Sequence, residues 1–272
     1  MYNIVEKRIL QEDIEWMRVH APYVARNAKA GHFVMVRVEE DGERVPLTIV
    51  DHDATDVVII YQKLGYTTKQ LSKKDVGDQL ETFQGPLGKA AHIRNKQHVI
   101  GVAGGVGSAP LLPQLKAYKE KGIRVDAILG ARSQDYLILL DEYRAICDQV
   151  FITTDDGSLG EKGLVTDALK TRLETDSSID HVIAIGPAIM MKFVVEMAKA
   201  HARSVDVSLN PIMIDGTGMC GNCRVSIAGK TYFACIDGPD FPGEDVDFDE
   251  LMARQSYYKK EEHDCYLRLK NE

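Results

Sequence analysis

The chain has 272 residues, of which 44% are hydrophobic and 27% are charged, and its formal net charge is −8. This length indicates about two domains, with three small ones possible, and the composition is ordinary for a soluble globular protein. The acidic balance argues against non-specific binding to nucleic acid or to an anionic membrane surface.

The N-terminus lacks the apolar core of a signal peptide, and the apolar stretch 182–198 is interrupted by Gly, Pro and charged residues. We therefore expect a cytoplasmic protein without a membrane span. An odd number of cysteines, 5, in a reducing compartment favours metal ligation over disulfides.

Residues 1–94 have the pattern of short strands separated by turns. The segment 31–38 alternates with a period of two, and β-branched runs follow at 48–50 and 57–61. Asp41-Gly42 predicts a hairpin turn, and the Gly-Pro-Leu-Gly segment at 85–88 predicts the end of this region. A small antiparallel β-barrel is the fold class that fits such spacing.

From residue 95 onward, strands alternate with helices. Buried strands are expected at 98–103, 124–129, 149–153 and 181–185, and helices at 111–121, 138–147, 164–173 and 190–201. Such βα units in series predict a doubly wound parallel sheet over residues 95–206, with a further strand possible at 205–209. Its ligand should lie at the carboxyl ends of the strands.

Glycines and polar residues follow each of these strands. The loop 104–107 separates a strand from a helix, so its backbone can approach a phosphate. Arg132 follows the second strand and on residues alone leans towards NADP, because an arginine can meet a 2′-phosphate. Asp156 and Gly186-Pro187 follow the next two strands. Each of these also fits an ordinary turn or a solvated side chain, but their shared position favours a nucleotide site.

Two barrel segments offer contacts to a flavin. Arg44 precedes a strand through Thr48, so the arginine can pair bidentately with a diphosphate and the threonine can offer a hydroxyl to a flavin ring. Gly65, Thr67 and Thr68 open an expected helix and suit a phosphate. Taken alone, each segment would be an ordinary strand edge or helix start.

The most specific pattern is Asp215, Cys220, Cys223 and Cys235. With cysteine in place of the aspartate, this spacing is the C-x4-C-x2-C…C pattern of a plant-type [2Fe–2S] site. A structural zinc site is the first alternative, although no histidine lies between residues 215 and 235. A chance grouping of structural cysteines is the second. The segment 224–233 predicts a hairpin that turns at residues 228–229, and the tail beyond residue 238 is left unassigned.

In this order the motifs resemble those of the ferredoxin-reductase-like flavoproteins over essentially the whole chain. The matching segments are Arg44-x-Pro-Leu-Thr48, Gly65-x-x-Thr68, Gly104-Gly-x-Gly-x-Ala-Pro110, Gly186-Pro-x-x-Met190 and the cysteine loop. Within this group the chain is similar to the electron-transfer subunit of dihydroorotate dehydrogenase type B, which has four cysteine ligands. Asp215 in the first position resembles instead the small subunit of NADH-dependent reduced ferredoxin:NADP oxidoreductase, also described as sulfide dehydrogenase.

The resemblance implies an FAD-binding barrel (1–94), an NAD(P)-binding α/β domain (95–206) and a small C-terminal [2Fe–2S] domain (207–272). It implies NAD(H), with NADP(H) kept open by Arg132, and no catalytic side chain beyond the cofactors. The implied cofactor contacts are Arg44, Pro46, Leu47, Thr48, Tyr61, Gln62, Gly65, Thr67, Thr68, Gly105, Gly107, Arg132, Asp156, Gly186 and Pro187. The implied cluster ligands are Asp215, Cys220, Cys223 and Cys235.

The resemblance also implies a larger partner subunit that carries a second flavin and [4Fe–4S] clusters, with flavin-based electron bifurcation there and an indirect link to ferredoxin. Two alternatives stay open at this point. One keeps the cofactors but makes the partner a dihydroorotate dehydrogenase. The other is a nucleotide-binding module with structural zinc and no turnover.

Overall fold

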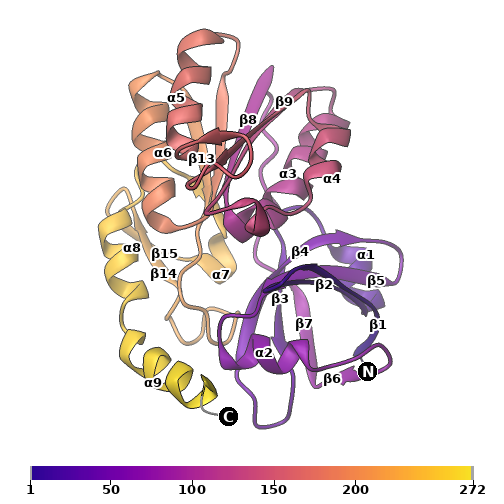
Figure 1. Cartoon of the computed structure of the whole chain (residues 1–272). Helices are drawn as coiled ribbons and strands as arrows, with labels where there is room; N and C mark the ends of the chain where they lie inside the picture. Colours follow the sequence, from indigo (N-terminus) through magenta and orange to yellow (C-terminus); the bar gives the residue numbers. More distant parts are fainter. Residues whose placement is uncertain (1, 271–272) are drawn as a thin grey trace.

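An antiparallel barrel forms the N-terminal third of the chain in the computed structural model, which describes residues 2–270 (Figure 1). Its strands pair in the order β6-β1-β2-β5-β4-β3-β7. They are β1 (Tyr2–Gln11), β2 (Ile14–His20), β3 (Phe33–Arg37), β4 (Arg44–His52), β5 (Asp56–Gln62), β6 (Gln79–Leu80) and β7 (Thr82–Leu87), and the helices are α1 (Pro22–Asn27) and α2 (Tyr66–Ser72). The antiparallel barrel expected from the sequence is confirmed.

The period-two alternation explains how β3 serves two environments. Val34 and Val36 are buried in the barrel core, whereas Met35 between them belongs to the buried cluster outside the barrel. The expected hairpin at Asp41-Gly42 joins β3 to β4, which pair antiparallel. The segment 85–88 was predicted to mark the end of this region, and this is confirmed: β7, the last strand of the barrel, pairs with β3 on an edge of the sheet and ends at Leu87.

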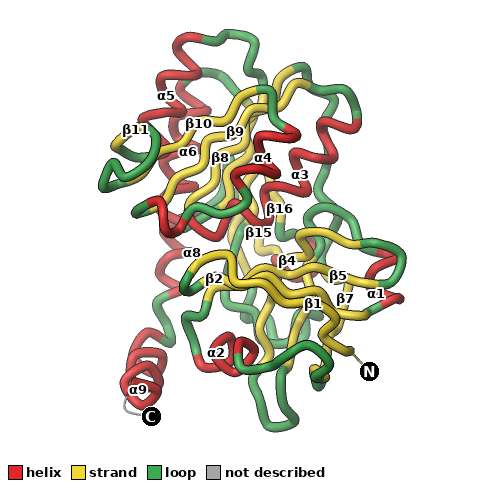
Figure 2. Tube along the Cα trace, turned by 45° about the vertical axis from the view of Figure 1, so that its right-hand side comes forward, coloured by secondary structure: helices red, strands yellow, loops and turns green. Residues whose placement is uncertain are grey.

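The middle part of the chain is built around a second seven-stranded sheet, whose strand order is β11-β10-β9-β8-β12-β13-β16 (Figure 2). The strands are β8 (His98–Gly104), β9 (Arg124–Ala131), β10 (Gln149–Thr154), β11 (Glu161–Lys162), β12 (His181–Ile185), β13 (Ser204–Ser208) and β16 (Asp240–Pro242). The first six run parallel and β16 pairs antiparallel with β13. All four predicted βα units are confirmed.

Helices cover both faces of this sheet, as a parallel sheet requires. On one face lie α3 (Ser108–Glu120) and α4 (Leu140–Ile146), and on the other α5 (Val165–Thr175) and α6 (Ala188–Ala200). Short 3₁₀ turns, η1 (Gly105–Gly107) and η2 (Gln134–Tyr136), follow β8 and β9. From β8 the chain first adds β9, β10 and β11 on one side of that strand, and it then crosses over to add β12 on the other side. The ligand crevice of such a fold lies at this reversal.

The C-terminal part links the other two. A hairpin of β14 (Arg224–Ile227) and β15 (Lys230–Phe233) turns at Ala228 and Gly229, both at positive φ, as predicted. The segment continues through α7 (Ala234–Asp237), β16, α8 (Phe248–Gln255) and α9 (Lys259–Lys270), the last of which packs against α2. The proposed boundary at residues 206–207 falls inside β13, and the domain limits stay predictions. Within residues 2–270 there is no helix with the length and apolarity to cross a membrane.

Candidate functional site

The crevice between the ends of β8 and β12 is built from two glycine loops. A Cβ atom on Gly107 would lie 2.4 Å from the carbonyl oxygen of Ile185, so only glycine lets η1 pack on the end of β12. Gly105 has φ +57° and its Cβ position meets no atom within 4 Å. Gly107 is therefore required by packing, whereas the backbone at Gly105 is open for a ligand to approach.

The facing loop has the same close packing. A Cβ atom on Gly186 would lie 2.9 Å from Cε of Met190 and 3.1 Å from the main-chain nitrogen of Gly104. Pro187 directly precedes α6. The structure thus brings together the predicted residues Gly105, Gly107, Gly186 and Pro187 at one edge of the sheet.

Arg132 and Asp156 lie on neighbouring loops at the same edge. The main-chain nitrogen of Asp156 donates to the carbonyl oxygen of Arg132 at 3.3 Å, and the arginine side chain is exposed. The Asp156 carboxylate accepts hydrogen bonds from the main-chain nitrogen and the hydroxyl of Ser158, which lower the pKa of that carboxyl. This carboxylate already caps its own turn, so Arg132 is the better placed of the two for a ribose or a phosphate.

The flavin residues predicted on β4 divide between two faces of the strand. Leu47 points into the barrel core, whereas Arg44, Pro46 and Thr48 alternate with it and lie on the outer face. An outer-face ligand can reach the side chains of those three residues, but only the main chain of Leu47.

The second flavin segment also divides. The Tyr61 ring is buried in the barrel core and its hydroxyl donates to a carboxylate oxygen of Glu15 at 2.7 Å. Any contact of Tyr61 with a cofactor therefore comes from its main chain. Gln62, Gly65, Thr67 and Thr68 follow on the surface, and the position of a Cβ on Gly65 is open. The Thr68 hydroxyl accepts from Gly65 N and donates to Gly65 O, which holds this loop together.

Two of the predicted cluster ligands lie side by side. The sulfurs of Cys223 and Cys235 are 3.1 Å apart and both side chains are buried. Burial, the hydrogen bond with Cys223 and the charge of Asp215 raise the pKa of the Cys235 thiol to about 12. A metal that binds here must displace these protons, as thiol ligands always require.

The other two predicted ligands lie on the preceding loop. The Asp215 carboxylate accepts from the main-chain nitrogens of Thr217, at 2.8 Å, and Cys220, at 3.0 Å, and these bonds lower its pKa. Cys220 is exposed. Across residues 2–270 no three Cys, His, Asp or Glu side chains converge into a metal-binding group.

The donors nevertheless fit a [2Fe–2S] cluster in kind and number, with three thiols and one carboxylate. Glycines at residues 216, 218 and 221 all have positive φ, so this loop can fold tightly around a compact ligand. The ligand set itself stays a prediction.

The cluster loop (residues 215–223) and the nucleotide crevice both adjoin the barrel. A Cβ on Gly216 would lie 2.6 Å from Cγ of Met35 on β3, so the cluster loop packs on the outer barrel face. Further along β4, Val50 shares a buried cluster with Ala109 in the first turn of α3. The outer face of β3 and β4 therefore touches the cluster loop at one place and the nucleotide crevice at another.

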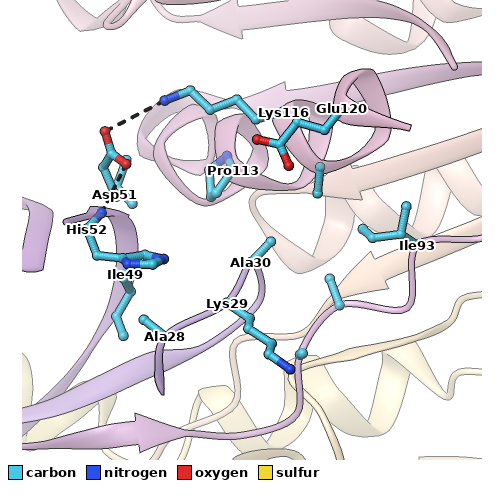
Figure 3. Close-up of a pocket in the computed structure, with 14 residues that line it drawn as sticks. Ala28, Lys29, Ala30, Ile49, Asp51, His52, Ile93, Pro113, Lys116 and Glu120 are labelled. Atoms are coloured by element: carbon cyan, nitrogen blue, oxygen red, sulfur yellow. Dashed lines mark hydrogen bonds and ion pairs between the residues drawn. The ribbon is translucent and has the colours of Figure 1, made fainter. Parts of the chain in front are cut away.

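A separate cavity of about 390 Å³ lies where the barrel meets α3 (Figure 3). Lys116 and Glu120 of α3 line it opposite Lys29 and His52 of the barrel. None of the predicted cofactor contacts lines this cavity, although their neighbour Val50 does.

Sequence reasoning missed residues that act through distant contacts. Met35, Glu15 and Asp240 carried no motif. The alternation of β3 could have pointed to Met35, since it faces away from the valines on either side. Nothing local identifies Glu15 or Asp240, whose partners lie far away in the chain.

Comparisons with known proteins agree with this geometry. A model of the iron–sulfur cluster binding domain of dihydroorotate dehydrogenase B matches residues 210–247, and a model of the oxidoreductase NAD-binding domain matches residues 102–196. The first match favours iron–sulfur over zinc in the cysteine loop.

Full-length relatives extend the match beyond these segments. An electron transfer subunit homolog of dihydroorotate dehydrogenase B from Thermotoga maritima is 46% identical over 98% of this chain and 95% of its own length. The dihydroorotate dehydrogenase B electron transfer subunit of Clostridium perfringens is 34% identical over 88% of this chain and 96% of its own.

Solved structures also resemble this chain. A chain from the NADH-dependent reduced ferredoxin-NADP oxidoreductase, solved in work on flavin-based electron bifurcation, is 44% identical with a TM-score of 0.93, covering 99% of this chain and 98% of that one. A ferredoxin NADP+ reductase from Neisseria gonorrhoeae, with bound FAD and NADP, is 16% identical with a TM-score of 0.61 and supports the fold alone.

Proposed function

Because the chain belongs to the family of dihydroorotate dehydrogenase B electron-transfer subunits and their homologues, we propose that it passes electrons between NAD(H), FAD and a [2Fe–2S] cluster inside a larger oxidoreductase. The observation that carries this proposal is the shared outer face of β3 and β4. The cluster loop packs on it at Met35, and the nucleotide crevice adjoins it at Val50.

The chain's own residues bind and orient the cofactors. The open backbone at Gly105 would receive a nicotinamide nucleotide, and the hydroxyl of Thr48 would hold a flavin along β4. The buried cluster of Val50 and Ala109 fixes the first turn of α3 against β4, beside both proposed sites. When bound, FAD exchanges two electrons with a nicotinamide and single electrons with an iron–sulfur cluster. Protein packing fixes the distances between these groups.

The partner in this proposal is a larger subunit with a second flavin and [4Fe–4S] clusters. Two observations support it: Asp215 stands in place of the first cysteine of the plant-type spacing, and the NADH-dependent reduced ferredoxin-NADP oxidoreductase chain matches over almost its whole length. Ile214, Met219 and Ile236 are exposed beside the cluster loop, with 89% exposure for Met219, and such apolar side chains suit a subunit interface. The names of the curated relatives favour a second candidate, a dihydroorotate dehydrogenase.

Anaerobic purification of the tagged chain from its own cells tests both parts. We expect a yellow-brown complex with FAD and about two iron atoms per copy of this chain, beyond the iron of its partner. Identification of the co-purified subunit by mass spectrometry separates the two candidate partners. A colourless, zinc-loaded chain would overturn the electron-transfer proposal.

Asp215→Cys tests the ligand set. The variant should keep its cluster, because a thiolate binds iron well, but the cluster's midpoint potential should shift, since ligand type and net charge set that potential. Redox titration followed by EPR measures it. Asp245→Cys, which adds a thiol at an exposed position of the same segment, serves as control. A midpoint potential equal to that of the unmodified protein would remove Asp215 from the ligand set.

A further inference from the structure

A buried carboxylate in the barrel connects both ends of the segment that follows β5. Glu15 on β2 is 4% exposed, and its carboxylate accepts the hydrogen bond of Tyr61. The ammonium groups of Lys7 and Lys63 lie 3.4 and 3.6 Å from its two oxygens. Glu15 therefore has one neutral donor and two cations around it.

Each partner of Glu15 is attached to the segment 61–74. Tyr61 lies near the end of β5, and Lys63 comes two residues before Gly65, which precedes α2. Lys7 reaches the other end, because its ammonium group donates to the carbonyl oxygens of Ser72, the last residue of α2, and of Lys74, the latter at 3.1 Å.

This arrangement exceeds what the barrel core needs. Burial of a carboxylate and an ammonium group costs free energy, and an apolar residue of similar size is often equally stable or more so at such a position. The hydrogen bonds of Tyr61 to Glu15 and of Lys7 to the carbonyl oxygens at the end of α2 do, however, fix direction, since hydrogen bonds weaken steeply outside a narrow geometry. The two ion pairs of Glu15 join these hydrogen bonds into one network. The network thus holds the backbone of residues 61–74 in one place relative to β1 and β2.

We propose that Glu15 is a positioning residue for FAD: through Lys63 and Lys7 it holds Gly65, Thr67 and Thr68 where they meet the diphosphate of the cofactor. The inference rests on the proposed function, in which this segment lies along FAD. Glu15 itself touches no cofactor in this proposal, since it is buried on β2 directly opposite Tyr61 of β5. Its loss should therefore weaken binding of the diphosphate by this segment and leave binding of the isoalloxazine ring, which is assigned to Thr48 on β4, unchanged.

Riboflavin has the isoalloxazine ring but lacks the diphosphate. Comparison of its affinity with that of FAD therefore separates binding of the ring from binding of the rest of the cofactor. Dissociation constants are measured by flavin fluorescence on the full chain after removal of its flavin. For Glu15→Gln we expect the dissociation constant of FAD to rise about tenfold, as for loss of a charged hydrogen-bond partner. That of riboflavin should stay within about twofold, as expected for a site the change does not reach. Glu12→Gln removes a charge from an exposed position nearby and should change neither.

Lys7→Met is the second variant, since it leaves Glu15 in place but breaks the link to the end of α2. It should shift FAD affinity in the same direction, and it decides the question if Glu15→Gln does not fold. Equal weakening of FAD and riboflavin in the folded variants would show a merely structural role, and an unchanged preference for FAD would show no role, so either result overturns the inference. If the unmodified chain shows no preference for FAD, the proposed diphosphate site fails instead.

Discussion

The nucleotide crevice and the cluster loop differ in how complete they are in the polypeptide alone. At the crevice, the loops after β8 and β12 already pack within van der Waals contact, and the open backbone at Gly105 needs no rearrangement. In the cluster loop, Cys223 and Cys235 lie together, but Cys220 is exposed and the Asp215 carboxylate bonds its own backbone.

The physical reason is the kind of protein group that binds each ligand. A nucleotide is bound mainly by backbone groups, whose places are set by the strands and by the helix that follows them. A metal cluster is bound by side chains that repel one another as anions, so the metal itself brings them together. Preformed geometry is thus expected at the crevice, and ligand-organised geometry is expected at the loop.

Replacement of a buried cysteine in the predicted ligand set should abolish binding of the cluster. In Cys223→Ser we expect loss of the cluster's visible absorption and EPR signal, because the sulfur pair with Cys235 disappears. NADH binding at the crevice, measured by calorimetry, should remain within about twofold, as for distant independent sites. Cys265→Ser, at a half-buried position in α9, is the matched control and should retain full iron content. Retention of the cluster in Cys223→Ser would contradict the assigned ligand.

Two alanine variants should separate packing from contact at the crevice. Gly107→Ala places a methyl group against the Ile185 carbonyl, so we expect a loss of about 1–3 kcal/mol in stability and weaker NADH binding. Gly105→Ala has room for its methyl and should lose about 1 kcal/mol from the left-handed backbone, yet it should still weaken NADH binding by occupying ligand space. Thermal unfolding and calorimetry measure the two effects. Equal losses of stability would show that the crevice is not preformed as described.

The contact of β16 with α3 and with the barrel should respond to pH. Asp240 on β16 accepts from Gln114 on α3, with both carboxylate oxygens 3.1 Å from the amide nitrogen, and a Cβ on Gly31 of the barrel would lie 2.7 Å from it. Burial raises the pKa of this carboxyl from 3.8 to about 7. Because the folded state holds this proton more tightly than the unfolded chain, the stabilisation is full below about pH 4 and is lost as pH rises to about 7.

Asp240→Asn should remove that dependence. The fall in melting temperature between pH 5 and pH 8 should be smaller than in the unmodified protein by about 2–4 °C, the shift typical of about 1 kcal/mol in a chain of this size. Differential scanning fluorimetry on the holoprotein gives both values. Asp245→Asn, at an exposed position, should leave the pH dependence unchanged. If the pH profile of Asp240→Asn matched that of the unmodified protein, this carboxyl would not be the cause of the pH dependence.

Much of the fold could be predicted because its signals are local. Alternation over 31–38 and the buried runs that begin at His98 and His181 needed only nearby residues, and the strands form there. The end of the barrel at 85–88 was also predictable, because glycine and proline mark strand ends and are tolerated on an edge strand such as β7. Leu47 and Tyr61 were placed in the right segments, but strand direction turns their side chains into the core.

The sequence by itself determined the chemistry of this protein: the cysteine spacing, the glycine loops and their order along the chain predict the cofactor classes, because ligand type and backbone freedom are properties of individual residues. Only the tertiary structure decided how these sites meet. Gly216 rests on Met35, β16 joins β13, and Glu15 gathers Lys7, Tyr61 and Lys63. Such contacts join residues far apart in the chain, and they form only when whole faces of the barrel and the sheet are buried together.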